Sequence, residues 1–138
     1  MVLLEHRTRP GESHFDWMLQ QESTPPEPTG DERTLTTFRV GERIDLLDEG
    51  AKFEAVRIHD HRLLYLTYEG ELSGGRGRVL RVASGHCRIL EDGAGLFAAE
   101  VDFGRGPLLV EGEPAAVSAS LGEGAGWRFV VRPGTPSR

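Results

Sequence analysis

The chain has 138 residues, of which 38% are hydrophobic and 28% are charged, a length that fits one domain with a single core. Its formal net charge of -6 excludes the broad basic surface that drives non-specific binding to nucleic acids. Its single cysteine, Cys87, excludes an internal disulfide framework and a paired-cysteine metal site, and we expect it to pack in a strand.

The N-terminal segments alternate in the manner of β-strands. The run "MVLLEH" is apolar and ends at His6, and "SHFDWMLQ" places apolar side chains on one face and His14, Asp16 and Met18 on the other. We expect two strands joined by the turn "RTRPGE". Residues 21–33 hold three prolines and mixed charge, which predicts a mobile surface loop.

The middle of the chain predicts further strands. They are "TLTTFRV" and "FEAVRIHDH", and the second places Arg57, His59 and His61 on one face. Between them, "GERIDLLDEGAK" is an irregular connection or a one-turn helix. The segment "RLLYLTYEGELSGGRGR" predicts a short helical turn and a glycine-rich loop, and "RVLRVASGHCRILED" predicts a hairpin around residues 83–85.

Four strand candidates complete the chain, namely "LFAAEVDF", "PLLVEGE", "AAVSASL" and "WRFVVR". Turn signals recur roughly every eight to twelve residues, which is typical of barrels and sandwiches. The sequence therefore predicts a mainly β fold: a single antiparallel β-barrel domain over residues 1–138, with at most one or two short helices and a frayed tail at 133–138.

Two pairs of polar residues stand two positions apart, His14 with Asp16 and His59 with His61, so each pair projects to one side of its strand. A hairpin would bring His6 alongside His14 or Asp16. Two imidazoles and one carboxylate suit Mn²⁺, Fe²⁺ or Zn²⁺ and leave coordination positions open. A merely hydrogen-bonded polar face gives the same spacing, so spacing alone leaves both interpretations open.

Together these segments resemble the 3′-phosphoesterase domain of bacterial DNA ligase D and its small stand-alone relatives. A strand ending in His, a turn and a His-aromatic-Asp strand are matched by "LLEHRTRPGESHFDWML". An Asp-His, a Tyr four residues later and an aromatic-Glu-Gly are matched by "HDHRLLYLTYEGELSGGRGRV". The resemblance implies a manganese-dependent phosphoesterase with a β-barrel fold that trims ribonucleotides and phosphate from DNA 3′ ends during end repair.

The resemblance also implies residue roles. The metal ligands would be His6, His14 and Asp16. The ion would be Mn²⁺, with Zn²⁺ or another transition metal as alternatives. His61 would contact the scissile phosphate or a metal-bound water, and Tyr65 would assist nearby. His59 stands where the family has an acidic residue, and we include it among the catalytic candidates.

Three positions depart from the family pattern: Met18, Glu42 and Phe53 stand where basic residues are expected. Phosphoryl transfer depends on cations that neutralise the phosphate oxygens, so these departures predict weakened or altered activity. The candidate substitutes are Arg39, Arg43, Lys52, Arg76, Arg78 and Arg81. The last three flank glycines and would form a phosphate clamp, with an ordinary polar hairpin face as the alternative.

The leading hypothesis is therefore a metal-dependent 3′-phosphoesterase that acts on DNA or RNA ends. One alternative is a non-catalytic metal-binding relative that serves as a binding or scaffold module among end-repair proteins. A cupin-like oxygenase barrel is a third hypothesis. That family usually has a second histidine ligand far downstream, which this chain lacks, because its last histidine is His86, expected on the surface. No apolar run approaches a membrane span of roughly 20 residues. We expect a cytoplasmic protein that binds nucleic-acid 3′ ends weakly and in a salt-sensitive manner.

Overall fold

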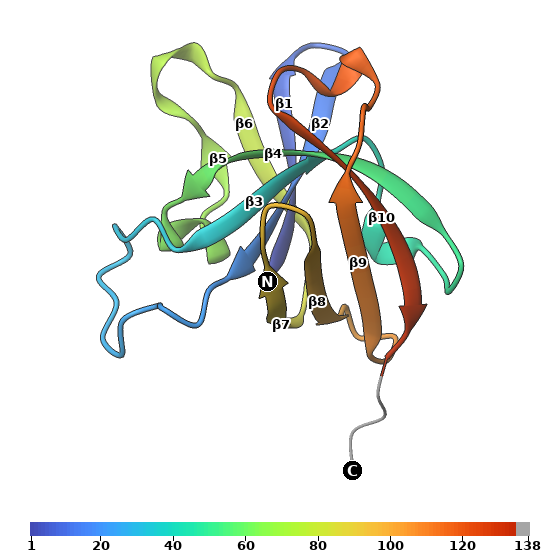
Figure 1. Ribbon diagram of the computed structural model, residues 1–138. Coiled ribbons are helices and arrows are strands. Elements are labelled where there is room, and N and C mark those ends of the chain that lie inside the picture. The colour runs from blue at the N-terminus through green and yellow to red at the C-terminus, as the bar shows by residue number, and fades with distance from the viewer. Residues whose placement is uncertain (135–138) are drawn as a thin grey trace.

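The computed structural model describes residues 1–134, in which turns and loops join ten strands (Figure 1). The strands are β1 (Val2–Arg9), β2 (Glu12–Gln20), β3 (Leu35–Val40), β4 (Lys52–His61), β5 (Gly70–Glu71), β6 (Arg78–Ser84), β7 (His86–Asp92), β8 (Phe97–Asp102), β9 (Leu108–Pro114) and β10 (Ala125–Pro133). Helical structure in the described range is limited to the 3-10 turns η1 (Ile44–Leu46), η2 (Leu63–Leu66), η3 (Ser73–Gly75) and η4 (Ala119–Leu121). None of these is long and apolar enough to cross a membrane. Most of the tail predicted to fray, 135–138, lies outside the described residues.

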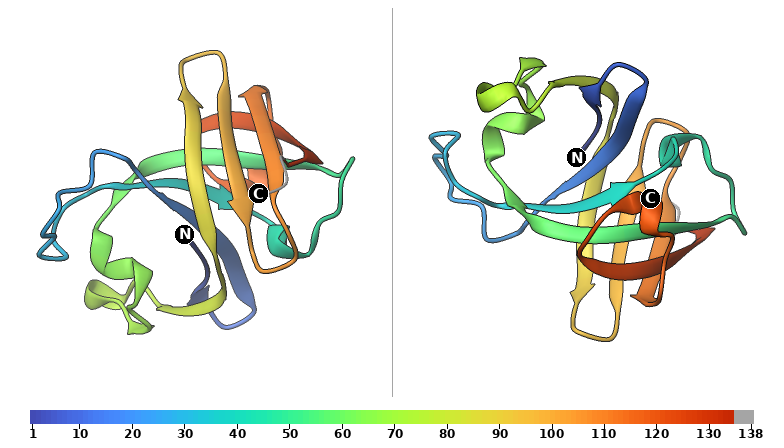
Figure 2. Two further views of the ribbon diagram at one scale, coloured as in Figure 1. Left: turned by 90° about the horizontal axis from the view of Figure 1, so that it is seen from below. Right: turned by 90° about the horizontal axis from the view of Figure 1, so that it is seen from above.

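All ten strands form one antiparallel sheet in the order β5-β6-β1-β2-β3-β4-β10-β9-β8-β7. The predicted mainly β, antiparallel fold with little helix is therefore confirmed. The ladder is not a closed barrel, because within residues 1–134 no strand pairing joins β5 or β6 to β7. Figure 2 shows how the sheet nevertheless curls around itself.

The hairpin predicted around residues 83–85 is wrong. β6 pairs with β1, β7 pairs with β8, and only Gly85 separates the two strands. A β-carbon on Gly85 would lie 2.0 Å from the carbonyl oxygen of Asp102, so this close approach requires glycine. The chain thus passes from β6, next to one end of the ladder, directly into β7 at the other end, and this connection draws the two ends of the sheet toward each other.

The strand predicted for "AAVSASL" is also wrong. Residues 115–118 are irregular and lead into η4, where the Ser118 hydroxyl accepts a hydrogen bond from the Ser120 amide. Serine side chains that bond to nearby backbone offer an alternative to a strand ladder. The one-turn helix considered for "GERIDLLDEGAK" is present as η1.

Two hydrophobic clusters pack on opposite faces of β1, β2 and β3, so both faces of these strands are buried. The larger cluster contains Leu3, Trp17, Leu19, Phe38, Phe53, Phe97, Trp127, Phe129 and Val131, among others. The smaller cluster contains Val2, Leu4, Met18, Leu35, Leu63, Tyr65 and Val79. Met18, expected on the polar face of its strand, is therefore buried under η2 and β6.

A β-bulge in β4 changes the direction of its last side chains. Thr37 pairs with Ile58, whereas Leu35 pairs with His61, so β4 has one extra residue in between. His61 consequently shares the face of Ile58, and the prediction that it shares a face with Arg57 is wrong. This face carries the smaller cluster and the candidate site.

The loop at 21–33 is fastened to η2 at its C-terminal end. The Leu63 amide donates to the carbonyl of Glu32 at 2.8 Å, and the Leu64 amide donates to that of Gly30 at 2.9 Å. The Glu32 carboxylate accepts hydrogen bonds from the amides of Thr29 and Gly30, which lower its pKa. This docking holds the end of the loop, with its basic residue Arg33, beside the candidate site.

Candidate metal centre

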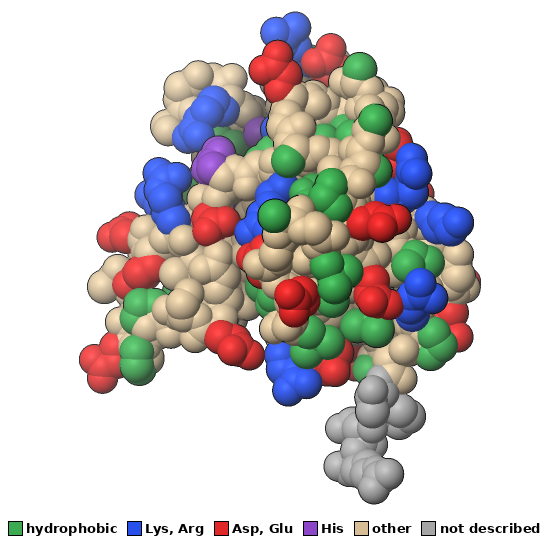
Figure 3. Space-filling model, viewed as in Figure 1, with side chains coloured by type: hydrophobic (Ala, Val, Ile, Leu, Met, Phe, Trp, Pro, Cys, Tyr) green, Lys and Arg blue, Asp and Glu red, His purple; other side chains and the backbone are tan. Residues whose placement is uncertain are grey.

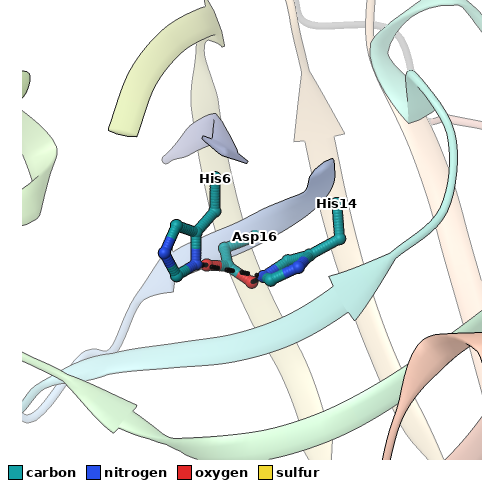
Figure 4. Close-up of side chains that lie close together, drawn as sticks. All are labelled: His6, His14 and Asp16. Carbon is teal, nitrogen blue, oxygen red and sulfur yellow. Dashed lines mark hydrogen bonds and ion pairs between the residues drawn. The ribbon is translucent and has the colours of Figure 1, made fainter. Parts of the chain in front are cut away.

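The hairpin of β1 and β2 brings His6, His14 and Asp16 together. His6 lies directly opposite His14 in the ladder, and Asp16 follows two residues later on the same face of β2. One ligand atom from each residue lies within 4.8 Å of the other two, and Figure 4 shows the three side chains converging on one point. The predicted cluster is present, and it could hold a metal ion.

A backbone carbonyl fixes the tautomer of His6. Its Nε2 lies 2.7 Å from the carbonyl oxygen of Arg76, and because a carbonyl only accepts, Nε2 must carry the proton. The lone pair of neutral His6 is therefore on Nδ1, which lies 3.2 Å from His14 Nε2 and 3.7 Å from Asp16 Oδ2. Metal-binding histidines are commonly oriented through their other nitrogen in this way.

Asp16 is only 4% exposed, and its Oδ1 accepts no hydrogen bond from the described residues, although His14 Nε2 lies 3.3 Å away. A buried carboxylate oxygen without a donor is costly, and a bound cation would compensate it. Two imidazole nitrogens and one carboxylate suit a divalent transition metal. The residues present therefore fit a metal ion.

The second signature lies at the same cavity, of about 260 Å³, which His6 and Asp16 also line. His61 donates its Nδ1 proton to the carbonyl of His59 at 2.9 Å, which leaves Nε2 as an acceptor. Burial lowers the pKa of His61, and the opposing effect of the Asp16 charge is smaller. His61 is therefore a neutral imidazole near pH 7.

The other two catalytic candidates flank His61. The ring of His59 stacks on that of His61 at a centroid distance of 4.6 Å, but its side chain is exposed. Tyr65 in η2 is 8% exposed and meets His61 edge to face at 5.7 Å. Both side chains thus orient the His61 ring, and both line the cavity.

The basic candidates divide into two groups. Arg39 and Arg76 line the cavity. Arg78 does not, because its neighbour Val79 packs in the smaller cluster and alternation directs Arg78 to the other face. Lys52 lies at a different cavity, near Glu42. The structure therefore does not bring Arg78 and Lys52 to the site.

Sequence reasoning missed Arg33 and Arg62, which also line the cavity. Arg62 lies within the second signature, directly after His61, and this adjacency was a usable signal. Arg33 has no local signal, because the docking of the 21–33 loop on η2 brings it there. Phe53, at one of the departures, packs in the larger cluster on the opposite face, so a basic residue there would not reach the cavity.

The cavity has a strongly positive lining for an acidic protein. Asp16 is the one acidic residue among the described lining residues, against the four arginines Arg33, Arg39, Arg62 and Arg76. In Figure 3 a histidine side chain lies close to basic side chains, and acidic and basic side chains are both spread over the rest of this face. Such a focused field attracts anions.

Metal binding is expected to stabilise the fold by mass action. Mn²⁺ at about 100 times its dissociation constant should raise the free energy of unfolding by about 2.7 kcal/mol, and EDTA should reverse the effect. The measurement is thermal unfolding with and without Mn²⁺. His14→Ala should abolish the rise, and His86→Ala, which removes an exposed histidine of β7, should retain it. Equal stabilisation of all three proteins would contradict a site at the triad.

Two members of the triad that could hold a metal ion, a neutral histidine and four arginines thus line one cavity, and the third member, His14, lies beside His6. No protein-family model and no curated protein matches this chain, so its function is inferred from its own residues and their geometry.

Proposed function

We propose that the protein is a metal-dependent phosphoesterase that removes phosphate or nucleotides from the 3′ ends of DNA or RNA. The observation that carries the proposal is that neutral His61 and four arginines line the same cavity as His6 and Asp16, two members of the triad that could hold a metal ion. Phosphoryl transfer requires such cationic groups and a proton acceptor, and this combination agrees with the resemblance to the ligase D phosphoesterase domain. The expected ion is Mn²⁺, with Zn²⁺ as the alternative.

Each of these residues has its own role in the proposed hydrolysis. A divalent ion on the triad would supply positive charge beside the phosphoryl group. Arg39 and Arg76 neutralise the phosphate oxygens, which gain charge in the transition state. His61 Nε2 accepts a proton from the attacking water as the water oxygen bonds to phosphorus. The bond from phosphorus to the sugar oxygen breaks, and that oxygen takes up a proton from solvent.

Tyr65 and the His59 carbonyl are positioning groups in this scheme. The carbonyl holds the Nδ1 proton of His61, and the Tyr65 ring fixes the imidazole plane. The expected substrate is an end, not a duplex surface, because the net charge of -6 disfavours extended contact with a polyanion. Binding to DNA ends should therefore weaken with salt.

The test is phosphate release from a 3′-phosphorylated primer-template with added Mn²⁺. We expect release by the wild-type protein and by His86→Ala, and only background release by His14→Ala. Background release by all three proteins, with Mn²⁺ still bound by the wild type, would overturn the enzyme and favour the non-catalytic metal-binding module.

A further inference from the structure

The four arginines of the cavity differ from most other arginines of the chain. Eight others have a carboxylate oxygen within 3.9 Å: Arg7, Arg43, Arg57, Arg81, Arg88, Arg105, Arg128 and Arg132. Across residues 1–134, no ion pair involves the cavity arginines Arg33, Arg39, Arg62 and Arg76. In a chain with 22 acidic residues, uncompensated cations around one cavity indicate an anionic ligand.

These arginines lie at two ends of the cavity. At the inner end, Arg39 is opposite Asp16 in the ladder, and the carbonyl of Arg76 accepts from His6. At the outer end, Arg62 follows His61, which pairs with the first residue of β3, and Arg33 lies two residues before that strand. Six residues of largely extended chain, roughly 20 Å, separate Arg33 from Arg39.

Arg33 and Arg62, the arginines at the outer end, have more unpaired N–H donors than those at the inner end. The guanidinium groups of Arg39 and Arg76 donate to the carbonyl oxygens of Leu121 and Ser73, respectively. No side-chain hydrogen bond to the described residues engages Arg33, and the guanidinium of Arg62 instead lies over the Tyr65 ring at 5.8 Å. A guanidinium fork with free N–H groups suits a phosphate.

Charge also argues for more than one phosphate. The four arginines of the cavity exceed the one carboxylate, that of Asp16, by three charges, to which a bound divalent ion would add two. A phosphomonoester carries about 1.5 to 2 negative charges near pH 7. One such group at the inner end therefore leaves the outer arginines uncompensated.

We propose that the cavity has two phosphate subsites: an inner one at the triad with Arg39 and Arg76, and an outer one at Arg33 and Arg62 that binds a second phosphate of the same ligand. The inner assignment rests on the proposed function, whereas the outer one rests on the unpaired arginines. For a strand end, the second group is the adjacent internucleotide phosphate.

The test is calorimetric binding, with Mn²⁺, of three probes: a nucleoside 3′-phosphorothioate, a dinucleotide ending in a 3′-phosphorothioate, and inorganic pyrophosphate. The phosphorothioate slows hydrolysis. The wild-type protein should bind the dinucleotide about tenfold more tightly than the mononucleotide, as expected for one charge-assisted hydrogen bond. Arg33→Ala and Arg62→Ala should each remove most of this gain and change mononucleotide affinity by less than about twofold.

Arg78→Ala is the matched control, since it removes the same charge from a position outside this cavity. It should preserve the gain. Persistence of the gain in both outer variants, or an equal loss for mononucleotide and dinucleotide, would overturn the outer subsite. A gain for pyrophosphate and none for the dinucleotide would overturn the strand end as the source of the second phosphate.

The two proposals fail in different ways. A dinucleotide gain that depends on Arg33 and Arg62, without phosphate release, would keep the outer subsite and overturn the enzyme. Phosphate release with equal affinities for the one-phosphate and two-phosphate probes would keep the enzyme and overturn the outer subsite.

Discussion

Replacement of Phe38 by alanine is expected to lower the free energy of unfolding by about 3–5 kcal/mol. Phe38 is fully buried in the larger cluster. Its ring centroid lies between 5.0 and 6.2 Å from those of Trp17, Phe97, Trp127 and Phe129. Rings held from several strands of the sheet collapse only partly into the space left by a phenyl group, so most of the cavity should remain. Chemical denaturation measures the loss.

Leu46→Ala is the control, because this side chain is 58% exposed in η1. Its effect should stay within about 0.5 kcal/mol. A Phe38→Ala protein within about 1 kcal/mol of the wild type would contradict the central place of this residue in the core. Phe38 pairs with Trp17 next to the pair of Asp16 and Arg39, so the same two strands carry the core and the site.

The clustering of His6, His14 and Asp16 was predictable because it depends on local geometry alone, whereas their role as metal ligands was implied by the resemblance. Alternation along one strand places His14 and Asp16 on one face, and a short hairpin places His6 opposite His14. Both rules act over fewer than about a dozen residues. The alternation of apolar and polar residues likewise predicted most of the strands, because side chains of an extended chain alternate between two faces whichever strand pairs with it.

The rest of the site depends on contacts that no local pattern specifies. The bulge in β4 reverses the direction of His61, and Arg33 reaches the cavity through a loop that docks on η2. Alternation describes the two faces of a strand but does not tell which faces are buried, so burial of Met18 was not foreseen. The bend at Gly85 depends on the approach of Asp102, seventeen residues later.

The His61→Gln protein is expected to lose activity by a factor of roughly 10² to 10⁴, the usual contribution of a general base. The Nε2 atom of His61 is a free acceptor at the cavity, and glutamine supplies no base of similar strength. Because His61 is not a member of the triad, Mn²⁺ should stabilise this variant against heat as it does the wild type. Initial rates of phosphate release and thermal unfolding measure the two properties.

The lowered pKa of His61 also predicts how the rate and the stability change with pH. Burial holds the pKa of His61 below its ordinary value of 6.5, so the wild-type rate should rise with pH through that lowered value and level off by neutrality. Stability should follow a related course: as pH falls below about 6.5, the unfolded chain binds a proton at this residue before the folded one does, and the fold is weakened. His61→Gln should lack the rise in rate and should lose less stability than the wild type as pH falls below about 6.5.

His86→Gln is the matched control for these measurements, since it makes the same change at an exposed position of β7. It should keep the wild-type rate, pH profile and acid stability. A His61→Gln protein that retains more than about a tenth of the wild-type rate would contradict the role of base. Loss of the Mn²⁺ effect together with the rate would instead place His61 among the metal ligands, and the proton from the attacking water would then need another acceptor in the cavity.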